Sequence, residues 1–402
     1  MKLSEELSWR GFVGQNTLGD ITDLDKKTRK FYLGCDPSAD SLQIGNLAAL
    51  MMARCFIKHG YESFMLAGGA TGQIGDPKDN EERQLKSLDE IAHNVKCIER
   101  QFAQIIGDDF TLVNNYDWFK DIKLLDFLRE VGKQFSMTQL LDREFVRARI
   151  GEGGVGISYA EFSYSLIQGY DYLYLFRKYG VDLQICGEDQ FGNCVSGLHL
   201  IKHLENKDVD VWSTPLVINK STGRKFGKSE GGAVWLSAEK TSPYQFYQFW
   251  LNVDDAGVID YMKVYTSLDK ETVDVIAQEH EANPSARVAQ RKLAYEVTAL
   301  VHGRDTAESV ERVTSVLFGG AELKSLSDTD LDELAREIPV LTTGCTVISA
   351  LVESGLATSS SEAGRLLKQG AISLNSAKIT TDVEINALSL VKKGKNSFVL
   401  VR

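Results

Sequence analysis

The sequence predicts an α/β protein with a parallel sheet first, a helical region second and a small distinct tail. Short apolar runs alternate with helix-length segments in the first half, and helical periodicity dominates from Asp254 to about Leu317. The tail, residues 337–402, holds seven Lys or Arg against five Asp or Glu, whereas the whole chain has a net charge of −11. With 402 residues, we expect two or three domains.

The composition excludes several classes of protein. Hydrophobic residues make up 43% and charged residues 25%, which is ordinary for a globular chain. The acidic net charge argues against nucleic-acid binding by bulk charge. Six cysteines without a CxxC pair argue against a disulfide framework and a cysteine-rich zinc site. No apolar run suggests a signal peptide or a membrane span, so we expect a cytoplasmic protein with no membrane partner.

The order of elements in the first half favours parallel strands joined by helices. Strands are expected at Phe31–Cys35, Ser63–Ala67, Asp182–Cys186 and Thr214–Val217. Helices are expected at Ile44–His59, closed by Gly60, and over a long polar segment that ends near Ile106. Ligands of such sheets bind in the loops that follow the strands, so those loops are the first place to look for a site.

The second half is predicted to be helical before a linker and the tail. Leu293 and Val297 share a helical face, and Gly303 is a plausible helix stop. A linker is expected at 321–338, within the Gly-, Ser- and acid-rich stretch 319–338. The predicted divisions are 1–220 for the sheet domain, 221–320 for a basic loop and a helical domain, 321–338 for the linker and 339–402 for the tail.

Two loops after predicted strands have the character of ligand sites. The segment Asp36–Asn46 leads from a strand into a helix, whose N-terminus favours phosphate, and Gly45 would allow a ligand close to the backbone. An ordinary capped turn is the alternative. The second loop, Gly68–Pro77, has four glycines in its first eight positions and is expected to form a pocket floor. It matches neither a dinucleotide-binding nor a P-loop pattern.

A third segment, Gly223–Ser229, ends in GKS but is not a P-loop. Only three residues separate Gly223 from Gly227, where that motif requires four. A loop with Lys225 and Lys228 would suit a departing polyphosphate, whose charge grows in the transition state. A solvated basic hairpin is the alternative.

A fourth segment places polar side chains on one helical face. Tyr164, Gln168 and Asp171 stand at i, i+4 and i+7, and could hold a ligand with an ammonium and a hydroxyl group. An exposed polar face is the alternative. His199 and His203 are four residues apart, but no HExxH motif or third ligand accompanies them, so no metal site is predicted.

Together these segments resemble the bacterial-type tyrosyl-tRNA synthetases, a class I aminoacyl-tRNA synthetase family. The similarity follows the family's order over nearly the whole chain, through YLGCDPSADSLQIGN, LAGGATGQIGDP, EFSYSLIQGYDY, LQICGEDQFGN and KFGKS. It implies a Rossmann-like α/β catalytic domain, an α-helical anticodon-binding domain and an S4-like α+β RNA-binding tail. It also implies ATP-dependent activation of L-tyrosine, with Mg²⁺, and transfer to tRNA(Tyr), by a homodimer that pairs near Val131–Met137.

The resemblance also implies roles for individual residues. The residues expected to bind tyrosine are Tyr32 and Asp171 at the phenol, Asp76, Tyr164 and Gln168 at the ammonium, and Gln190 at the carboxylate. The residues expected to line the ATP and adenylate site are Gly34, Asp36, Gly45, Asn46, Gly187 and Asp189. The residues expected to act on the phosphates are Ser38, Gln43, Lys225, Lys228 and Ser229. The residues expected to contact RNA are Arg365, Lys368, Lys392, Lys393 and Lys395. Catalysis would rest on positioning and charge, without a protein nucleophile.

The chain departs from the family at the first signature. The usual HIGH reads QIGN, so Gln43 and Asn46 replace two histidines, and Ser38 replaces a threonine. Gln43 keeps an N–H donor that could partly replace an imidazole. These departures raise a second hypothesis, in which the chain is a synthetase-like protein that binds tyrosine or RNA with little aminoacylation activity. The intact KFGKS segment and the predicted tyrosine site favour the active enzyme.

Overall fold

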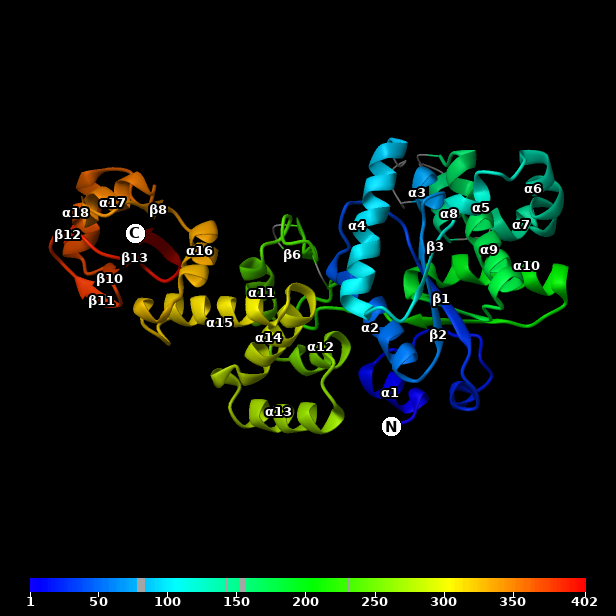
Figure 1. The fold of residues 1–402 in the computed structure, drawn as a ribbon, viewed down its shortest axis with the longest axis horizontal. Helices are drawn as coiled ribbons and strands as arrows, with labels where there is room; N and C mark the ends of the chain where they lie inside the picture. Colours follow the sequence, from blue (N-terminus) through cyan, green and yellow to red (C-terminus); the bar gives the residue numbers. More distant parts are fainter. Residues whose placement is uncertain (78–83, 142–143, 152–155, 227, 230–231) are drawn as a thin grey trace. The chain divides into compact units, whose positions relative to one another are not determined.

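A five-stranded parallel sheet organises the first part of the chain (Figure 1). The computed structural model describes residues 1–77, 84–141, 144–151, 156–226, 228–229 and 232–402. The strands are β1 Lys30–Cys35, β2 Glu62–Ala67, β3 Thr111–Asn114, β4 Leu183–Gly187 and β5 Asp210–Thr214. Their order is β3-β2-β1-β4-β5, with every pairing parallel. The order changes direction between β1 and β4, which is where an open α/β sheet forms its ligand crevice.

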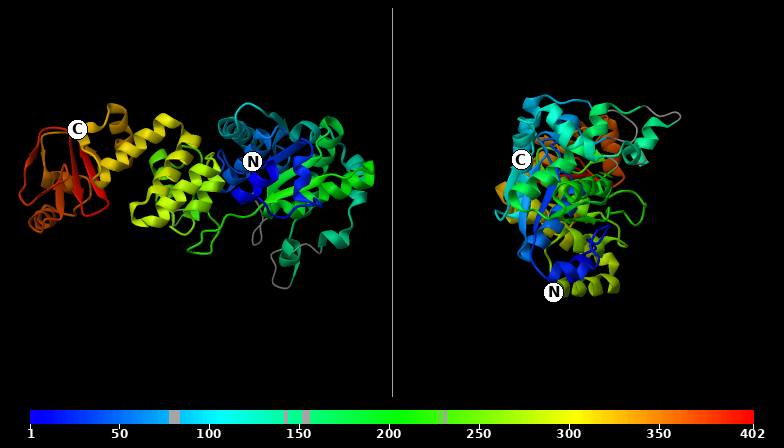
Figure 2. Two further views of the ribbon diagram at one scale, coloured as in Figure 1. Left: turned by 90° about the horizontal axis from the view of Figure 1, so that it is seen from below. Right: turned by 90° about the vertical axis from the view of Figure 1, so that its right-hand side faces the viewer.

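Side chains that alternate along β1 pack against helices on both faces of this sheet. Phe31 packs against Phe56 of α2 with ring centroids 5.4 Å apart, and Tyr32 packs against Tyr172 of α9 at 5.2 Å. Neighbouring strand residues point to opposite faces, so α2 and α9 cover opposite sides, as Figures 1 and 2 show. The sheet is therefore buried on both faces, which confirms the predicted Rossmann-like α/β arrangement.

The helices of the sheet region follow the predicted order. They are α1 Leu3–Arg10, α2 Ile44–Lys58, α3 Thr71–Ile74, α4 Leu88–Ile106, α5 Tyr116–Phe119, α6 Leu124–Glu130, α7 Met137–Leu141, α8 Glu144–Ile150, α9 Tyr159–Tyr179 and α10 Phe191–Glu205. The two helices predicted in the first half correspond to α2 and α4. Among the described residues, no helix is both long and apolar enough to cross a membrane.

Two strand predictions need correction. The strand expected at Thr214–Val217 is wrong, because β5 ends at Thr214. Pro215 follows and has no N–H to donate to a neighbouring strand. The strand β3 was not predicted at all. It lies at the edge of the sheet with Thr111 and Leu112 exposed, so its apolar signal is weak.

The chain forms two units, and the first extends beyond the boundary predicted at residue 220. It comprises Met1–Thr241 and Asn252–Leu293, and so includes β6 Lys228–Ser229, β7 Gly232–Ala233, α12 Val258–Tyr265 and α13 Lys270–Ala282. Arg10 of α1 helps to hold α12 there, since its guanidinium donates to the carbonyl oxygens of Lys263, Thr266 and Leu268 at 2.8 to 2.9 Å.

The second unit comprises Ser242–Leu251 and Ala294–Arg402. Its helices are α11 Pro243–Leu251, the end of α14 Val288–His302, α15 Arg304–Phe318, α16 Asp328–Glu337, α17 Val347–Glu353 and α18 Ser360–Lys368. Its strands are β8 Val340–Leu341, β9 Cys345–Thr346, β10 Ile372–Leu374, β11 Ala377–Ile379, β12 Glu384–Ile385, β13 Ser389–Lys393 and β14 Ser397–Val401. The tail combines a sheet ordered β11-β10-β13-β14-β8 with α17 and α18, so the α+β prediction is confirmed (Figure 2). Gly303 ends α14 as predicted.

The segment predicted as a linker, 321–338, contains a packed helix. The Ser327 hydroxyl caps α16 by accepting the Asp330 N–H at 3.2 Å. Leu331 and Leu334 are buried in one cluster with Val313 of α15 and Phe398 of β14. The linker prediction is wrong because the polar residues of this stretch form the cap and the outer face of a helix whose leucines are in the core.

Candidate active site

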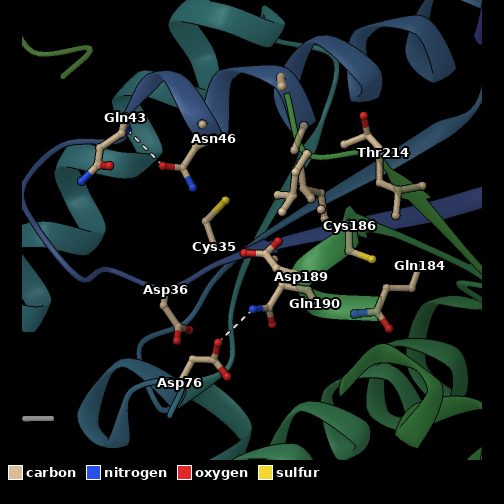
Figure 3. Close-up of a pocket in the computed structure, with 18 of the residues that line it drawn as sticks. Cys35, Asp36, Gln43, Asn46, Asp76, Gln184, Cys186, Asp189, Gln190 and Thr214 are labelled. Carbon is tan, nitrogen blue, oxygen red and sulfur yellow. Dashed lines mark hydrogen bonds between the residues drawn. The ribbon is translucent and has the colours of Figure 1, made fainter. Parts of the chain in front are cut away.

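A cavity of about 420 Å³ opens beyond the carboxyl ends of β1 and β4, where the strand order predicts a ligand site (Figure 3). The predicted residues that line it are Tyr32, Gly34, Asp36, Ser38, Gln43, Gly45, Asn46, Asp76, Tyr164, Gln168, Asp171, Gly187, Asp189, Gln190 and Lys225. Gly227 and the side chains of Lys228 and Ser229 lie outside the described residues. Segments far apart in the sequence therefore meet at one cavity.

The predicted phenol site is the most enclosed part of this cavity. Tyr32 is 1% exposed and Asp171 is 2% exposed. The Asp171 carboxyl accepts hydrogen bonds from Trp118 Nε1 at 3.0 Å and from Asn115 Nδ2 at 3.1 Å. Burial raises the pKa of the Asp171 carboxyl well above its ordinary value, although these two hydrogen bonds oppose the shift. Burial likewise raises the pKa of the Tyr32 phenol.

Three buried polar atoms at the cavity have no hydrogen-bond partner among the described residues: Tyr32 Oη, Gln168 Oε1 and Gln184 Oε1. Buried polar groups in folded proteins are nearly always paired, so atoms left unpaired at a cavity indicate a ligand that completes them. Gln184 was not predicted as a site residue. The sequence could have indicated Gln184, because it is a polar residue inside an otherwise apolar strand and close to the end of the strand where ligands bind.

Two carboxylates held by neutral donors lie at the predicted ammonium site: Asp76, which was predicted there, and Asp36, which was predicted at the adenylate site. Asp36 accepts the hydroxyl of Tyr164 at 2.8 Å and that of Thr71 at 2.7 Å. Burial raises the pKa of the Tyr164 phenol, as does the neighbouring Asp36. Two carboxylates fixed beside an enclosed cavity suit a cationic group.

Asp76 is the second of these carboxylates. It accepts Gln190 Nε2 at 2.9 Å (Figure 3) and Asn193 Nδ2 at 3.1 Å. Sequence reasoning missed Asn193, as it missed Thr71, Asn115 and Trp118. All four act by orienting another side chain; Thr71 and Asn193 lie within the family strings LAGGATGQIGDP and LQICGEDQFGN, but the resemblance gave them no role.

The first-signature residues lie at the N-terminus of α2. The Gln43 N–H donates to Asn46 Oδ1 at 3.0 Å, so Asn46 caps the helix and its oxygen is engaged (Figure 3). A Cβ placed on Gly45 would meet no atom within 4 Å, which leaves the approach to the helix N-terminus open. Gln43 is half-buried and Asn46 is exposed, in contrast to the enclosed phenol site.

The basic segment after β5 forms a hairpin that brings Lys225 to the cavity. Asn219 N–H donates to the carbonyl of Arg224 at 2.9 Å, and Phe226 N–H donates to that of Val217 at 2.8 Å. Lys225 Nζ lies 3.6 Å from Asp189 Oδ2, and both side chains are about half exposed. The loop thus places one cation beside Asp189, a residue expected to line the ATP and adenylate site. Beyond it, the backbone of Lys228 and Ser229 pairs with β7.

The tail residues predicted to contact RNA fall into two groups. Arg365 and Lys368 are exposed on α18, and Lys395 is exposed between β13 and β14. Lys392 Nζ instead donates to the carbonyl of Leu317 at 3.2 Å, and Lys393 Nζ donates to that of Leu356 at 2.5 Å. These two ammonium groups have structural partners within the second unit.

The segment predicted at the dimer interface was expected to offer exposed apolar groups. Val131 does not, because it is completely buried, whereas Met137 is 58% exposed. Among the described residues, no group of three or more His, Cys, Asp or Glu side chains is placed to hold a metal ion.

Comparisons with known proteins agree with this site. The family model described as tRNA synthetases class I (W and Y) matches residues 24–319. The chain is 39% identical to a tyrosine–tRNA ligase of Levilactobacillus brevis, covering 100% of this chain and 99% of that protein. It is 40% identical to tyrosine–tRNA ligase 2 of Bacillus cereus, with 100% and 99% covered.

A solved structure has the same fold. The crystal structure of a C-terminally truncated mitochondrial tyrosyl-tRNA synthetase of Aspergillus nidulans superimposes with a TM-score of 0.71 and 29% identity, covering 79% of this chain and 94% of that chain. The family match spans well over half of the chain, and the curated relatives span its whole length. The chain therefore belongs to the tyrosine–tRNA ligase family of class I tRNA synthetases.

Proposed function

We propose that this protein is an active tyrosine–tRNA ligase of the cytoplasm, which activates L-tyrosine with ATP and transfers it to tRNA(Tyr). The observation that carries the proposal is the enclosed pair Tyr32 and Asp171, with an unpaired phenol oxygen on Tyr32. A tyrosine side chain placed between them would bring a hydroxyl to a part of the cavity that is buried and polar. All six cysteines are free thiols, consistent with a reducing compartment.

The phenol site explains how tyrosine would be told from phenylalanine. Phenylalanine would leave Tyr32 Oη and the Asp171 carboxyl without the hydroxyl that completes them. Sites that bury partners for a hydroxyl reject its absence strongly, and tyrosine–tRNA ligases are themselves a standard example of this rule. Gln168, Tyr164, Asp36 and Asp76 would hold the ammonium, and Gln190 would face the carboxylate.

Activation would proceed by in-line displacement. An oxygen of the tyrosine carboxylate forms a bond to the α-phosphorus of ATP, the bond from that phosphorus to the bridging oxygen breaks, and its electron pair leaves with pyrophosphate. The protein would supply position and charge: the N-terminus of α2, the amide donors of Gln43 and Asn46, and the ammonium groups of Lys225 and Lys228.

The described residues fit a magnesium ion brought by the nucleotide better than one held by the protein alone. They contain no cluster of three candidate ligands. Magnesium typically binds through one or two carboxylates together with substrate phosphates, and Asp189 is the half-exposed carboxylate at this end. When bound, the ion would neutralise charge on the phosphates.

The competing hypothesis is a tyrosine- or RNA-binding protein with little aminoacylation activity, and the amides at the first signature favour it. Tyrosine-dependent exchange of labelled pyrophosphate into ATP separates the two. We expect exchange with tyrosine and none with phenylalanine. Tyrosine binding by calorimetry without any exchange would establish the competing hypothesis instead.

We propose that the tail binds tRNA(Tyr) through Arg365, Lys368 and Lys395, the exposed members of the predicted set. Deleting the tail from Pro339 would be a poor test, because Leu390 and Phe398 share a core with Val313 and Leu334. Replacing Arg365 and Lys368 together by Ala should weaken tRNA binding and flatten its salt dependence, while adenylate formation is retained. Unchanged binding would exclude this surface.

We propose a homodimer that pairs through the exposed apolar side chains between β3 and α7. These are Leu112, Tyr116, Leu124, Leu125, Leu128, Met137 and Leu141. Leu125 is 77% exposed, and Leu85, outside this stretch, is 78% exposed and serves as a matched control. Leu125→Glu should shift light scattering toward the monomer mass of 44.6 kDa, whereas Leu85→Glu should not. A monomeric wild type at micromolar concentration would contradict the proposal.

A further inference from the structure

The helix α12 packs against the basic hairpin that carries Lys225. Phe226, the residue after Lys225, is 6% exposed. Its ring stacks on Tyr261 of α12 with centroids 4.4 Å apart and an interplanar angle of 27°. It also meets Tyr265, one turn further along α12, at 5.8 Å. The aromatic pair on α12 therefore fixes the arm of the hairpin that enters the cavity.

The same helix also holds the turn of the hairpin. Lys220 N–H donates to Tyr261 Oη at 3.3 Å, and the Lys220 ammonium pairs with the Asp260 carboxylate. The Tyr261 hydroxyl in turn donates to Asp254 Oδ2 at 3.1 Å. Tyr261 thus contacts one arm of the hairpin through its ring and the turn at Lys220 through its oxygen.

A glycine leaves room for the Tyr261 ring. A Cβ on Gly257 would lie 2.4 Å from Tyr261 Cζ and 2.5 Å from its oxygen. Gly257 has φ −103° and ψ −17°, a backbone conformation that alanine adopts without strain. A methyl group there would displace the tyrosine ring without a backbone cost.

We propose that Tyr261, supported by Tyr265, is a positioning residue for tyrosine activation, which docks the basic hairpin so that Lys225 is already at the phosphate side of the cavity when ATP binds. This inference rests on the proposed function. The docked arm brings Lys225 Nζ to 3.6 Å from Asp189, at the cavity that Phe226 and Tyr265 also line. Preorganisation of a cation lowers the barrier of the chemical step more than it strengthens ground-state binding.

Three variants separate the ring from the hydroxyl and from general packing. Tyr261→Leu removes the stacking surface, Gly257→Ala displaces the ring, and Tyr261→Phe keeps the ring but loses the oxygen. We expect single-turnover adenylate formation to fall roughly 10- to 100-fold in the first two, because small displacements of catalytic groups cost about that much. Tyr261→Phe should recover most of the loss. Tyrosine affinity measured by calorimetry should change less than about twofold.

A second measurement reports docking without catalysis. Trypsin cleavage after Arg224 or Lys225, followed by mass spectrometry in the absence of substrates, requires the hairpin to open. Tyr261→Leu and Gly257→Ala should be cleaved faster than the wild type, and Tyr261→Phe at nearly the wild-type rate.

The two readouts distinguish the possible failures. Unchanged cleavage and an unchanged rate in Tyr261→Leu and Gly257→Ala would overturn the inference. So would equal losses of rate and tyrosine affinity with unchanged cleavage, since that pattern means general damage to the fold. If the wild type forms no adenylate, the proposed function fails, and cleavage alone then decides whether α12 docks the hairpin.

Discussion

The two ends of the cavity are built differently. At the tyrosine end, Tyr32 and Asp171 are almost completely buried, and Asp171 is held by Asn115 and Trp118. At the phosphate end, the side chains of Lys225 and Asp189 are about half exposed. The tyrosine end resembles a protein core that contains a few polar atoms without a hydrogen-bond partner. The phosphate end resembles an ordinary protein surface.

This difference suggests that substrate choice and reaction rate are set separately. The buried end selects by leaving polar atoms unpaired unless a phenol enters, which needs a rigid surround. The open end must admit ATP and release pyrophosphate, so its side chains are exposed. Because they are exposed, substitutions there have less effect on the fold. The departures from the family pattern, Gln43, Asn46 and Ser38, all lie at the open end.

The largest expected effect on amino-acid affinity comes from a substitution at the tyrosine end of the cavity. Asp171→Ala removes the proposed acceptor of the phenol hydroxyl, and should weaken tyrosine binding by about 3 kcal/mol, roughly 100-fold, while phenylalanine binding changes little. Calorimetry with both amino acids measures this. Tyr32→Phe, which removes one hydroxyl without a cavity, should show a smaller loss in the same direction. Equal binding of the two amino acids to the wild type would refute the assigned phenol site.

At the open end, Lys225→Ala should have the opposite profile. Removing one charge from a half-exposed site should lower the rate constant of adenylate formation by about 10-fold, leaving tyrosine affinity unchanged. Single-turnover kinetics at saturating tyrosine would show the loss. Arg224→Ala, one residue earlier and also exposed, is the matched control and should have little effect. A loss of tyrosine affinity in Lys225→Ala would show that the two ends are not independent.

The smallest effect is a difference in the pH dependence of stability. Because burial raises the pKa of Asp171 in the folded state, the folded protein holds that proton more tightly than the unfolded chain does. The free energy of unfolding should therefore decline as pH rises above the ordinary value of 3.8, relative to Asp171→Asn. A difference in packing between the two proteins shifts the plot of unfolding free energy against pH by a constant amount and leaves its slope unchanged. If these plots for the two proteins are parallel from pH 4 upward, the raised pKa of Asp171 is contradicted.

The sequence predicted the residues to which helical spacing or the family resemblance assigns a role, and missed those that orient them. Tyr164, Gln168 and Asp171 were found because helical spacing puts them on one face. Asn115 and Trp118 lie at the start of and within α5, and Asn193 lies in α10, and only the folded chain brings them to Asp171 and Asp76. Contacts over such separations carry no periodic signal.

The errors in the fold have physical causes of the same kind. A strand was expected at Thr214–Val217, yet Pro215 ends β5. A linker was expected at 321–338 because the stretch is rich in polar residues, but it contains α16, whose leucines are buried. Val131 was expected at a surface, but tertiary packing buries it. RNA contact by Lys392 and Lys393 stays a prediction, and only the folded structure shows that their ammonium groups also donate to backbone carbonyls.

The central claim is that the amide at Gln43 limits the rate without affecting the choice of amino acid, and one measurement tests it directly. Adenylate formation should be followed in single turnovers over a range of tyrosine concentrations, for the wild type and for Gln43→His. A lost donor to a developing oxyanion costs about 10²- to 10³-fold, and the amide should recover part of this. We therefore predict a rate constant about 10-fold higher in Gln43→His, with the same half-saturating concentration of tyrosine. A slower variant would show that the pocket is built around glutamine, and would contradict the account.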